Sequence, residues 1–110
     1  MTNIEDLIVE IVKFRDERDW SQFHNSKDLA LAISIEAAEL NELFLWKNSE
    51  DVDANAMKLE LADVLIFAFL LAKKNSLNIG EIILEKLELN ALKYPVKKAR
   101  GSAKKYTDLQ

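Results

Sequence analysis

The chain is poor in residues that cross-link a fold or interrupt a helix. Its 110 residues include no cysteine, two glycines and one proline. Without cysteine there is no disulfide framework, no thiolate chemistry and no cysteine-based zinc site, which suits a protein of the cytosol. So few turn-forming residues argue against a β-sandwich and favour long helices.

Long apolar runs are also missing. The longest, residues 61–72, spans 12 residues and contains Asp63, whereas a membrane-spanning helix needs about 20 apolar residues. The first residues are acidic and lack the basic and then apolar pattern of a signal peptide. We therefore expect a cytoplasmic protein with no membrane partner.

Charge is distributed unevenly along the chain. The net charge is −4, yet residues 93–110 hold six basic residues and one acidic residue. An acidic body with a basic tail fits a metal site beside an anion site. On charge alone it fits a nucleic-acid-binding tail about as well, and a solvated, frayed tail is a further alternative.

Helical spacing of apolar residues predicts a single all-α domain over residues 1–110, folded as a small four-helix bundle. The expected helices cover about residues 3–19, 27–47, 52–74 and 79–92. The third is apolar nearly all round from Leu61 onward, so it should lie centrally. One thin layer of helices could hardly cover it, and we expect part of its surface to meet a second subunit in a homo-oligomer.

Three polar pairs and the one proline indicate where these helices begin and end. Thr2 followed by Glu5 is typical of a capping box, and Asn25-Ser26 marks the start of the second helix. Asn78 with Glu81 marks the start of the fourth. Pro95 disfavours helical geometry at the preceding residue, so that helix should end there.

Two pairs of carboxylates stand inside apolar segments, Glu36 with Glu39 and Glu60 with Asp63. The i, i+3 spacing places each pair on one helix face. If the two helices are antiparallel, both patches meet inside the bundle, where ionised carboxylates are costly unless paired or bound to metal. Oxygen ligands favour a hard cation such as Mg²⁺. The alternative is a set of ordinary surface glutamates. A di-iron site is disfavoured because the only histidine, His24, lies in a linker.

Aromatic residues flank these acidic segments. Trp20 and Phe23 lie between the first two helices, where such residues usually fill a corner of the core. Trp46 follows Glu36, Glu39 and Leu43 on one expected helix face. Its ring could stack on a nucleobase or cover the rim of the core, and sequence alone favours neither. His24 could contact a phosphate or base, although a lone histidine is usually a surface or capping residue.

Taken together, these residues resemble the MazG-like all-α nucleotide pyrophosphohydrolases, and within them the dCTP pyrophosphatase branch. Similarity covers about residues 10–109. It is carried by the four carboxylates and by the following segments: Arg18-Asp19-Trp20, Gln22-Phe23-His24, residues 39–44 with Trp46-Lys47, residues 61–66, Asn90, Lys93-Tyr94-Pro95, Arg100-Gly101-Ser102 and Lys105-Tyr106-Thr107.

The resemblance implies Mg²⁺-dependent hydrolysis of a nucleoside triphosphate to monophosphate and pyrophosphate, with Mn²⁺ as a substitute ion. It also implies a homotetramer, a dimer of dimers with sites completed across subunits, and no nucleic-acid partner. Glu36, Glu39, Glu60 and Asp63 would hold the ion, and Trp20, His24 and Trp46 would line the base and sugar pocket. The residues expected near the phosphates are Asn90, Tyr94, Arg100, Lys104, Lys105 and Tyr106.

Two residues depart from the pattern of this branch. Phe67 stands where dCTP-preferring relatives carry a tyrosine, and Leu45 stands where they carry a glutamine. Each change removes a polar group that could contact the substrate. Pyrimidine deoxynucleotides, dCTP and its modified forms, are the favoured substrates, but these departures leave the preference for base and sugar open.

A different class of function remains compatible with the sequence. A non-catalytic helical module could use the basic tail to bind nucleic acid or a partner protein, with salt-sensitive affinity and no metal requirement. A nucleotide sensor with the same fold is a second alternative. Retention of all four carboxylates argues against the sensor, because sensing needs fewer ligands.

Overall fold

The computed structural model describes residues 3–109, and within that range the chain is helical, with no strand. The chain forms two compact units, the first ending at Leu77 and the second beginning at Asn78. The helices are α1 (Ile4–Glu17), α2 (Ser26–Glu42), α3 (Ala54–Lys74), α4 (Ile79–Lys93) and the single turn α5 (Val96–Ala99). The all-α prediction is therefore confirmed for the described residues.

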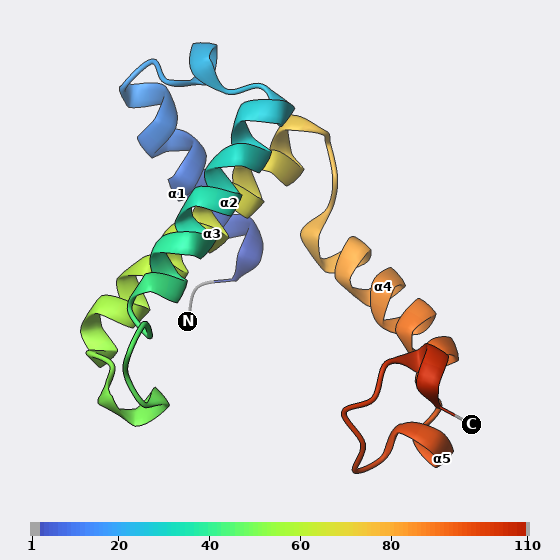
Figure 1. Cartoon of the computed structure of the whole chain (residues 1–110). Helices are drawn as coiled ribbons and strands as arrows, with labels where there is room; N and C mark the ends of the chain where they lie inside the picture. The colour runs from blue at the N-terminus through green and yellow to red at the C-terminus, as the bar shows by residue number, and fades with distance from the viewer. Residues whose placement is uncertain (1–2, 110) are drawn as a thin grey trace. The chain divides into compact units, whose positions relative to one another are not determined.

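In the first unit, α3 packs against both α1 and α2 (Figure 1). Asn75, at the end of α3, donates a hydrogen bond to Ser26 Oγ at the start of α2, with a length of 3.0 Å. Because the end of one helix meets the start of the other, α2 and α3 are antiparallel neighbours. Leu29 of α2 and Leu70 of α3 are buried. The apolar third helix thus has the central position that its sequence predicts.

Asparagine side chains cap the starts of these helices. Asn25 Oδ1 accepts a hydrogen bond from the backbone N–H of Asp28 at 2.8 Å, and Asn78 Oδ1 accepts one from Glu81 at 2.9 Å. Both predicted caps are confirmed, and each such cap contributes about 1 kcal/mol to stability. At α1 the cap is Asn3. The predicted capping residue Thr2 lies outside the described residues.

The predicted boundaries of the second helix were wrong at its C-terminal end. α2 stops at Glu42, not near residue 47, because Leu43, Phe44 and Leu45 form i to i−3 turn hydrogen bonds. Trp46 then adopts a left-handed backbone with φ 63°. The expectation that Trp46 continues the helix face of Glu36 and Glu39 is therefore also wrong. The next helix, α3, begins at Ala54, and the side chain of Asp53 caps its N-terminus.

The second unit contains α4 and the basic tail. As predicted, α4 ends before Pro95, with Tyr94 at its C-cap. The rings of Tyr94 and Tyr106 meet edge to face at 6.0 Å, and Lys93 Nζ lies 4.9 Å from the centre of the Tyr106 ring. These contacts place the Tyr106 ring against the end of α4, while most of the tail remains exposed to solvent. α5 was not predicted, because one turn is too short to show a helical period.

Many large apolar side chains of the first unit are exposed. They occur on all three of its helices and include Leu7, Val9, Phe14, Leu31, Ile35, Leu59, Leu61 and Leu65. Exposed apolar groups in such number are typical of a surface that contacts other protein. No helix within residues 3–109 has the length and apolar character needed to cross a lipid bilayer.

Candidate metal centre

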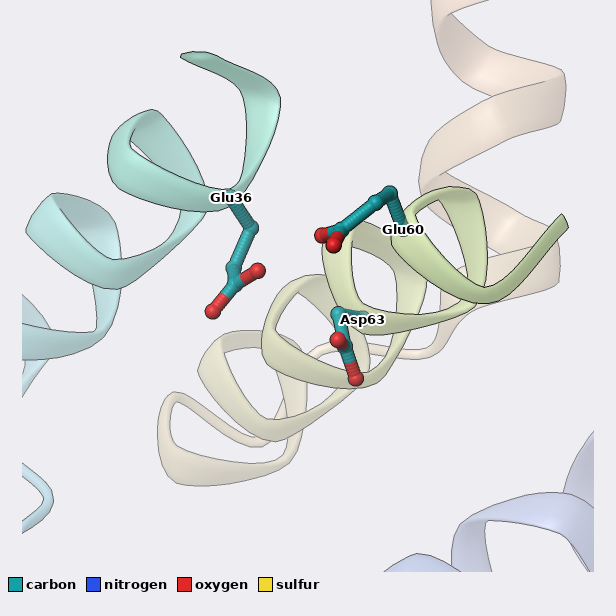
Figure 2. A group of neighbouring side chains, drawn as sticks. All are labelled: Glu36, Glu60 and Asp63. Carbon is teal, nitrogen blue, oxygen red and sulfur yellow. The ribbon is translucent and has the colours of Figure 1, made fainter. Parts of the chain in front are cut away.

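Three carboxylates from α2 and α3 converge at one place (Figure 2). One oxygen each from Glu36, Glu60 and Asp63 lie within 4.8 Å of one another. Glu60 and Asp63 share a face of α3 because they are three residues apart, and the packing of α2 against α3 brings Glu36 to the same face. The sequence prediction that the two acidic patches meet is confirmed for these three side chains.

Two oxygen atoms in this cluster lack the partners that buried polar atoms normally have. Glu36 Oε2 and Glu60 Oε2 are buried and accept no hydrogen bond from the described residues. Buried polar atoms are usually satisfied, because the cost of desolvation is otherwise not recovered. A divalent cation would satisfy both atoms and neutralise the converging charges. An all-oxygen set of this kind fits a hard ion such as Mg²⁺, Mn²⁺ or Ca²⁺.

The electrostatics of the cluster also favour a bound cation. Burial, a hydrogen bond with Glu39 and repulsion by the neighbouring carboxylates raise the pKa of Glu36 from 4.5 to about 7. Burial and repulsion by Glu39 and Asp63 also raise the pKa of Glu60. Glu39 is exposed and outside the converging set of three, but it is close enough to raise the pKa of both half-buried carboxyls. Without a cation, part of this cluster stays protonated near neutral pH.

This shift predicts a pH-dependent stability of the metal-free protein. The folded state raises the pKa of Glu36, so the protonated carboxyl stabilises the fold. This contribution to the free energy of unfolding is fully present below pH 4.5 and is lost as the pH rises through about 7. In EDTA, the melting temperature of Glu36→Gln should therefore fall less between pH 4.5 and 8 than that of wild type. Equal slopes in thermal melts of the two proteins would contradict the assignment.

A cavity of about 910 Å³ adjoins the cluster within the first unit. α1 and α3 provide most of its wall, and Asp63 belongs both to this wall and to the acidic cluster. Trp20 and His24 line it as well, so three of the side chains predicted from sequence share one cavity. The remaining lining side chains are mostly apolar and include Leu7, Ile11, Phe14, Ile66, Phe67 and Leu70.

His24 faces this cavity as a neutral ring. Burial lowers the pKa of its imidazole, and the positive charges of Arg15 and Lys74 lower it further. Its Nδ1 atom is buried without a hydrogen-bond partner among the described residues. A neutral imidazole has one donor and one acceptor nitrogen. His24 can therefore form a hydrogen bond with a polar group of a ligand but does not supply a cation for phosphate at neutral pH.

Trp46 does not line this cavity. Its side chain is fully exposed and its φ is 63°, a backbone conformation that is uncommon for a bulky residue. The alternative that Trp46 covers the rim of the chain's own core is not supported, because the ring contacts too little of it. Backbone strain of this kind concentrates at active sites, ligand clamps and switch regions.

The residues expected near phosphates all lie in the second unit. Tyr94 and Tyr106 are brought together as a ring pair, and Arg100 is the C-cap of α5. The backbone N–H of Lys104 donates to Ser102 Oγ at 3.2 Å. Most of these side chains are exposed, with Asn90 half-buried, and the set comprises Asn90, Tyr94, Arg100, Lys104, Lys105 and Tyr106.

Sequence reasoning did not assign a role to α1 in the site. Its apolar residues served only to predict a helix, yet Leu7, Ile11 and Phe14 line the cavity. Arg18 lines it too, and only its place in the Arg18-Asp19-Trp20 segment could have drawn attention to it. Apolar periodicity shows which helix face is covered but does not distinguish packed core from the wall of a pocket.

An all-helical chain with converging carboxylates beside an apolar cavity is a candidate for a divalent-cation-dependent enzyme acting on a partly apolar ligand. Comparison with known proteins identifies the family. Residues 31–109 match the MazG-like family, and the chain belongs to it.

Individual relatives support this membership. The chain is 40% identical over 114 aligned residues to dCTP pyrophosphatase 1 of Bos taurus, with 96% of this chain and 68% of that protein covered. The human dCTP pyrophosphatase 1 is 37% identical, with 96% and 67% covered. Among solved structures, a pyrophosphatase from Archaeoglobus fulgidus is similar with a TM-score of 0.79 and 37% identity, covering 86% of this chain and 94% of that one.

Proposed function

We propose that this protein is a nucleoside triphosphate pyrophosphohydrolase that cleaves dCTP, or a modified dCTP, into the monophosphate and pyrophosphate. The observation that carries the proposal is the convergence of Glu36, Glu60 and Asp63 at the edge of the cavity. The similarity to enzymes named dCTP pyrophosphatase 1 supports the substrate. Such an enzyme would serve to control the nucleotide pool.

In this proposal the two parts of the site bind different parts of the nucleotide. Glu36, Glu60 and Asp63, with Glu39 beside them, would hold Mg²⁺, for which Mn²⁺ would substitute. When bound, the ion neutralises phosphate oxygens and makes a bound water more acidic. A carboxylate oxygen that does not bind the ion accepts the proton of the attacking water. Asp63 touches both cluster and cavity, so it marks where the triphosphate meets the nucleoside.

The cavity is the proposed base and sugar pocket. Trp20 offers an aromatic surface, and neutral His24 offers a hydrogen bond to a polar edge of the base or sugar. Phe67 lines the same cavity, so its lack of a hydroxyl bears directly on substrate preference. Trp46 would stack on the base from outside this cavity. The second unit would supply donors to the phosphates: Asn90, Tyr94, Arg100, Lys104, Lys105 and Tyr106.

We further propose that residues 1–110 act as one domain within a homotetramer, a dimer of dimers. The exposed apolar side chains of α1, α2 and α3 support an assembly, because they need cover from other protein surface. In such an assembly, each site would include residues from more than one subunit, which accounts for the exposure of Trp46.

A hydrolysis panel tests this function. Purified protein with Mg²⁺ is incubated with the common ribo- and deoxynucleoside triphosphates and with 5-substituted dCTP, and products are separated by ion-exchange chromatography. We expect monophosphate and pyrophosphate, with the highest kcat/KM for dCTP or a 5-substituted form. A folded protein that hydrolyses none of these but binds DNA or RNA in a salt-dependent way would instead support the binding-module alternative.

A further inference from the structure

Arg18, just after the end of α1, has contacts that no step of the proposed function uses. Its Nη1 donates to the carbonyl oxygen of Phe14 at 3.0 Å. Its guanidinium carbon lies 3.6 Å from the centre of the Phe14 ring and 6.0 Å from that of Trp20. The two rings meet edge to face with centroids 5.8 Å apart. The guanidinium therefore lies over the Phe14 ring, and the Trp20 ring is at the limit of cation–π range.

The backbone around this group is also fixed. Asp19 adopts φ 53°, and the next N–H, that of Trp20, turns back to donate to Arg15 O at 3.1 Å. Gln22 Nε2 donates to both the backbone oxygen and Oδ2 of Asp19, each at 3.0 Å. The chain thus leaves α1 through a hydrogen-bonded corner that sets the direction of the Trp20 side chain.

Arg18 and the two aromatic residues beside it all line the candidate site. Phe14, Arg18 and Trp20 line the cavity that also contains His24 and Asp63. If Arg18 served only to cap α1, a lysine could perform the same task, because an ammonium also donates to a terminal carbonyl. The planar guanidinium differs from an ammonium in that it stacks on a ring face while its edge donates hydrogen bonds.

We propose that Arg18 is a positioning residue for the nucleoside pocket. Its guanidinium holds Phe14 and Trp20 in one relative arrangement and so fixes the Trp20 ring against which the base binds. This inference rests on the proposed function. Arg18 lies outside the converging set of carboxylates, and its guanidinium donates to the Phe14 carbonyl oxygen, so its removal should weaken nucleoside binding and discrimination among bases without slowing the chemical step.

The test compares Arg18→Lys, Arg18→Met and Phe14→Leu with wild type. For dCTP we expect KM to rise about 5- to 10-fold with kcat within about 2-fold. The preference for dCTP over dTTP should shrink by a similar factor. Lys73→Met is the matched control, because it removes an exposed cation from the last turn of α3 outside the cavity, and it should leave both constants unchanged.

A second readout does not need turnover. Equilibrium binding of dCMP should weaken by the same factor in the three variants. Arg18→Lys matters most, because it keeps the charge and the capping donor and loses only the planar group. Wild-type dCMP affinity in Arg18→Lys would overturn the proposal, and so would a loss of kcat that is equal for all nucleotides and parallels a lower melting temperature.

These outcomes also separate this inference from the proposed function. A wild type that binds dCMP but hydrolyses no nucleotide contradicts the proposed activity, and the binding comparison still decides the role of Arg18. If wild type hydrolyses dCTP and Arg18→Lys has an unchanged KM and base preference, the proposed activity is supported. The proposed role of Arg18 is then contradicted. A wild type that neither hydrolyses dCTP nor binds dCMP contradicts both.

Discussion

Asp63→Asn is expected to lower kcat/KM for dCTP by at least about 100-fold with the fold intact. The substitution keeps the size of the side chain but removes a negative charge from a site where three carboxylates converge within 4.8 Å. Asp63 is exposed, so the loss of its charge should not destabilise the helix. Steady-state hydrolysis over a range of Mg²⁺ concentrations measures the effect, and part of it should be recovered at high Mg²⁺.

Glu42→Gln is the control for this substitution. Glu42 is an exposed residue in the last turn of α2 and lies outside the converging set. Its neutralisation should leave kcat/KM within about 2-fold of wild type, whereas Glu36→Gln and Glu60→Gln should resemble Asp63→Asn. Full activity in a well-folded Asp63→Asn would exclude the acidic cluster as the metal centre.

The double substitution Leu31→Lys with Ile35→Lys is expected to dissociate the proposed homo-oligomer. These residues are one turn apart on α2 and are 56% and 49% exposed. Two charges on an apolar face buried between subunits would carry a desolvation cost that association cannot recover. We expect the molar mass measured by light scattering to fall to that of one 12.6 kDa chain. Activity should fall at least about 10-fold, because each site would lose residues from its partner.

Asn41→Lys provides the comparison, since Asn41 is an exposed polar residue on the same helix. It adds one positive charge without altering the apolar face, and the oligomer and its activity should persist. A wild type that is monomeric and active would show that each chain holds a complete site. In that case the exposure of Leu31 and Ile35 would not indicate an interface that the site requires.

Local signals in the sequence account for much of the fold. Asn25 and Asn78 cap helices as predicted because capping needs only a side-chain oxygen and the next few backbone N–H groups. Pro95 ends α4 for an equally local reason. The end of α2 was not predictable in this way. Leu43, Phe44 and Leu45 are compatible with a helix, and only the turn that positions Trp46 ends it.

The acidic part of the candidate site was predictable from the sequence, but the surroundings of Arg18 were not. The spacing of Glu60 and Asp63 fixes their common face, so their meeting with Glu36 required only antiparallel neighbouring helices. The proximity of Arg18 to the Trp20 ring was not foreseeable, because it depends on the left-handed backbone at Asp19. Aspartate enters that conformation more readily than most residues but does not require it, and the hydrogen bonds from Gln22 stabilise it here.

The most direct test of the proposed chemistry is the phosphorus NMR spectrum of dCTP incubated with wild-type protein and Mg²⁺. Cleavage between the α and β phosphates predicts that the three dCTP resonances give way to those of dCMP and pyrophosphate, and that EDTA prevents the change. Formation of dCDP with inorganic phosphate would contradict the proposed bond cleavage. An unchanged spectrum from folded protein would contradict the assignment of Glu36, Glu60 and Asp63 as a catalytic metal centre.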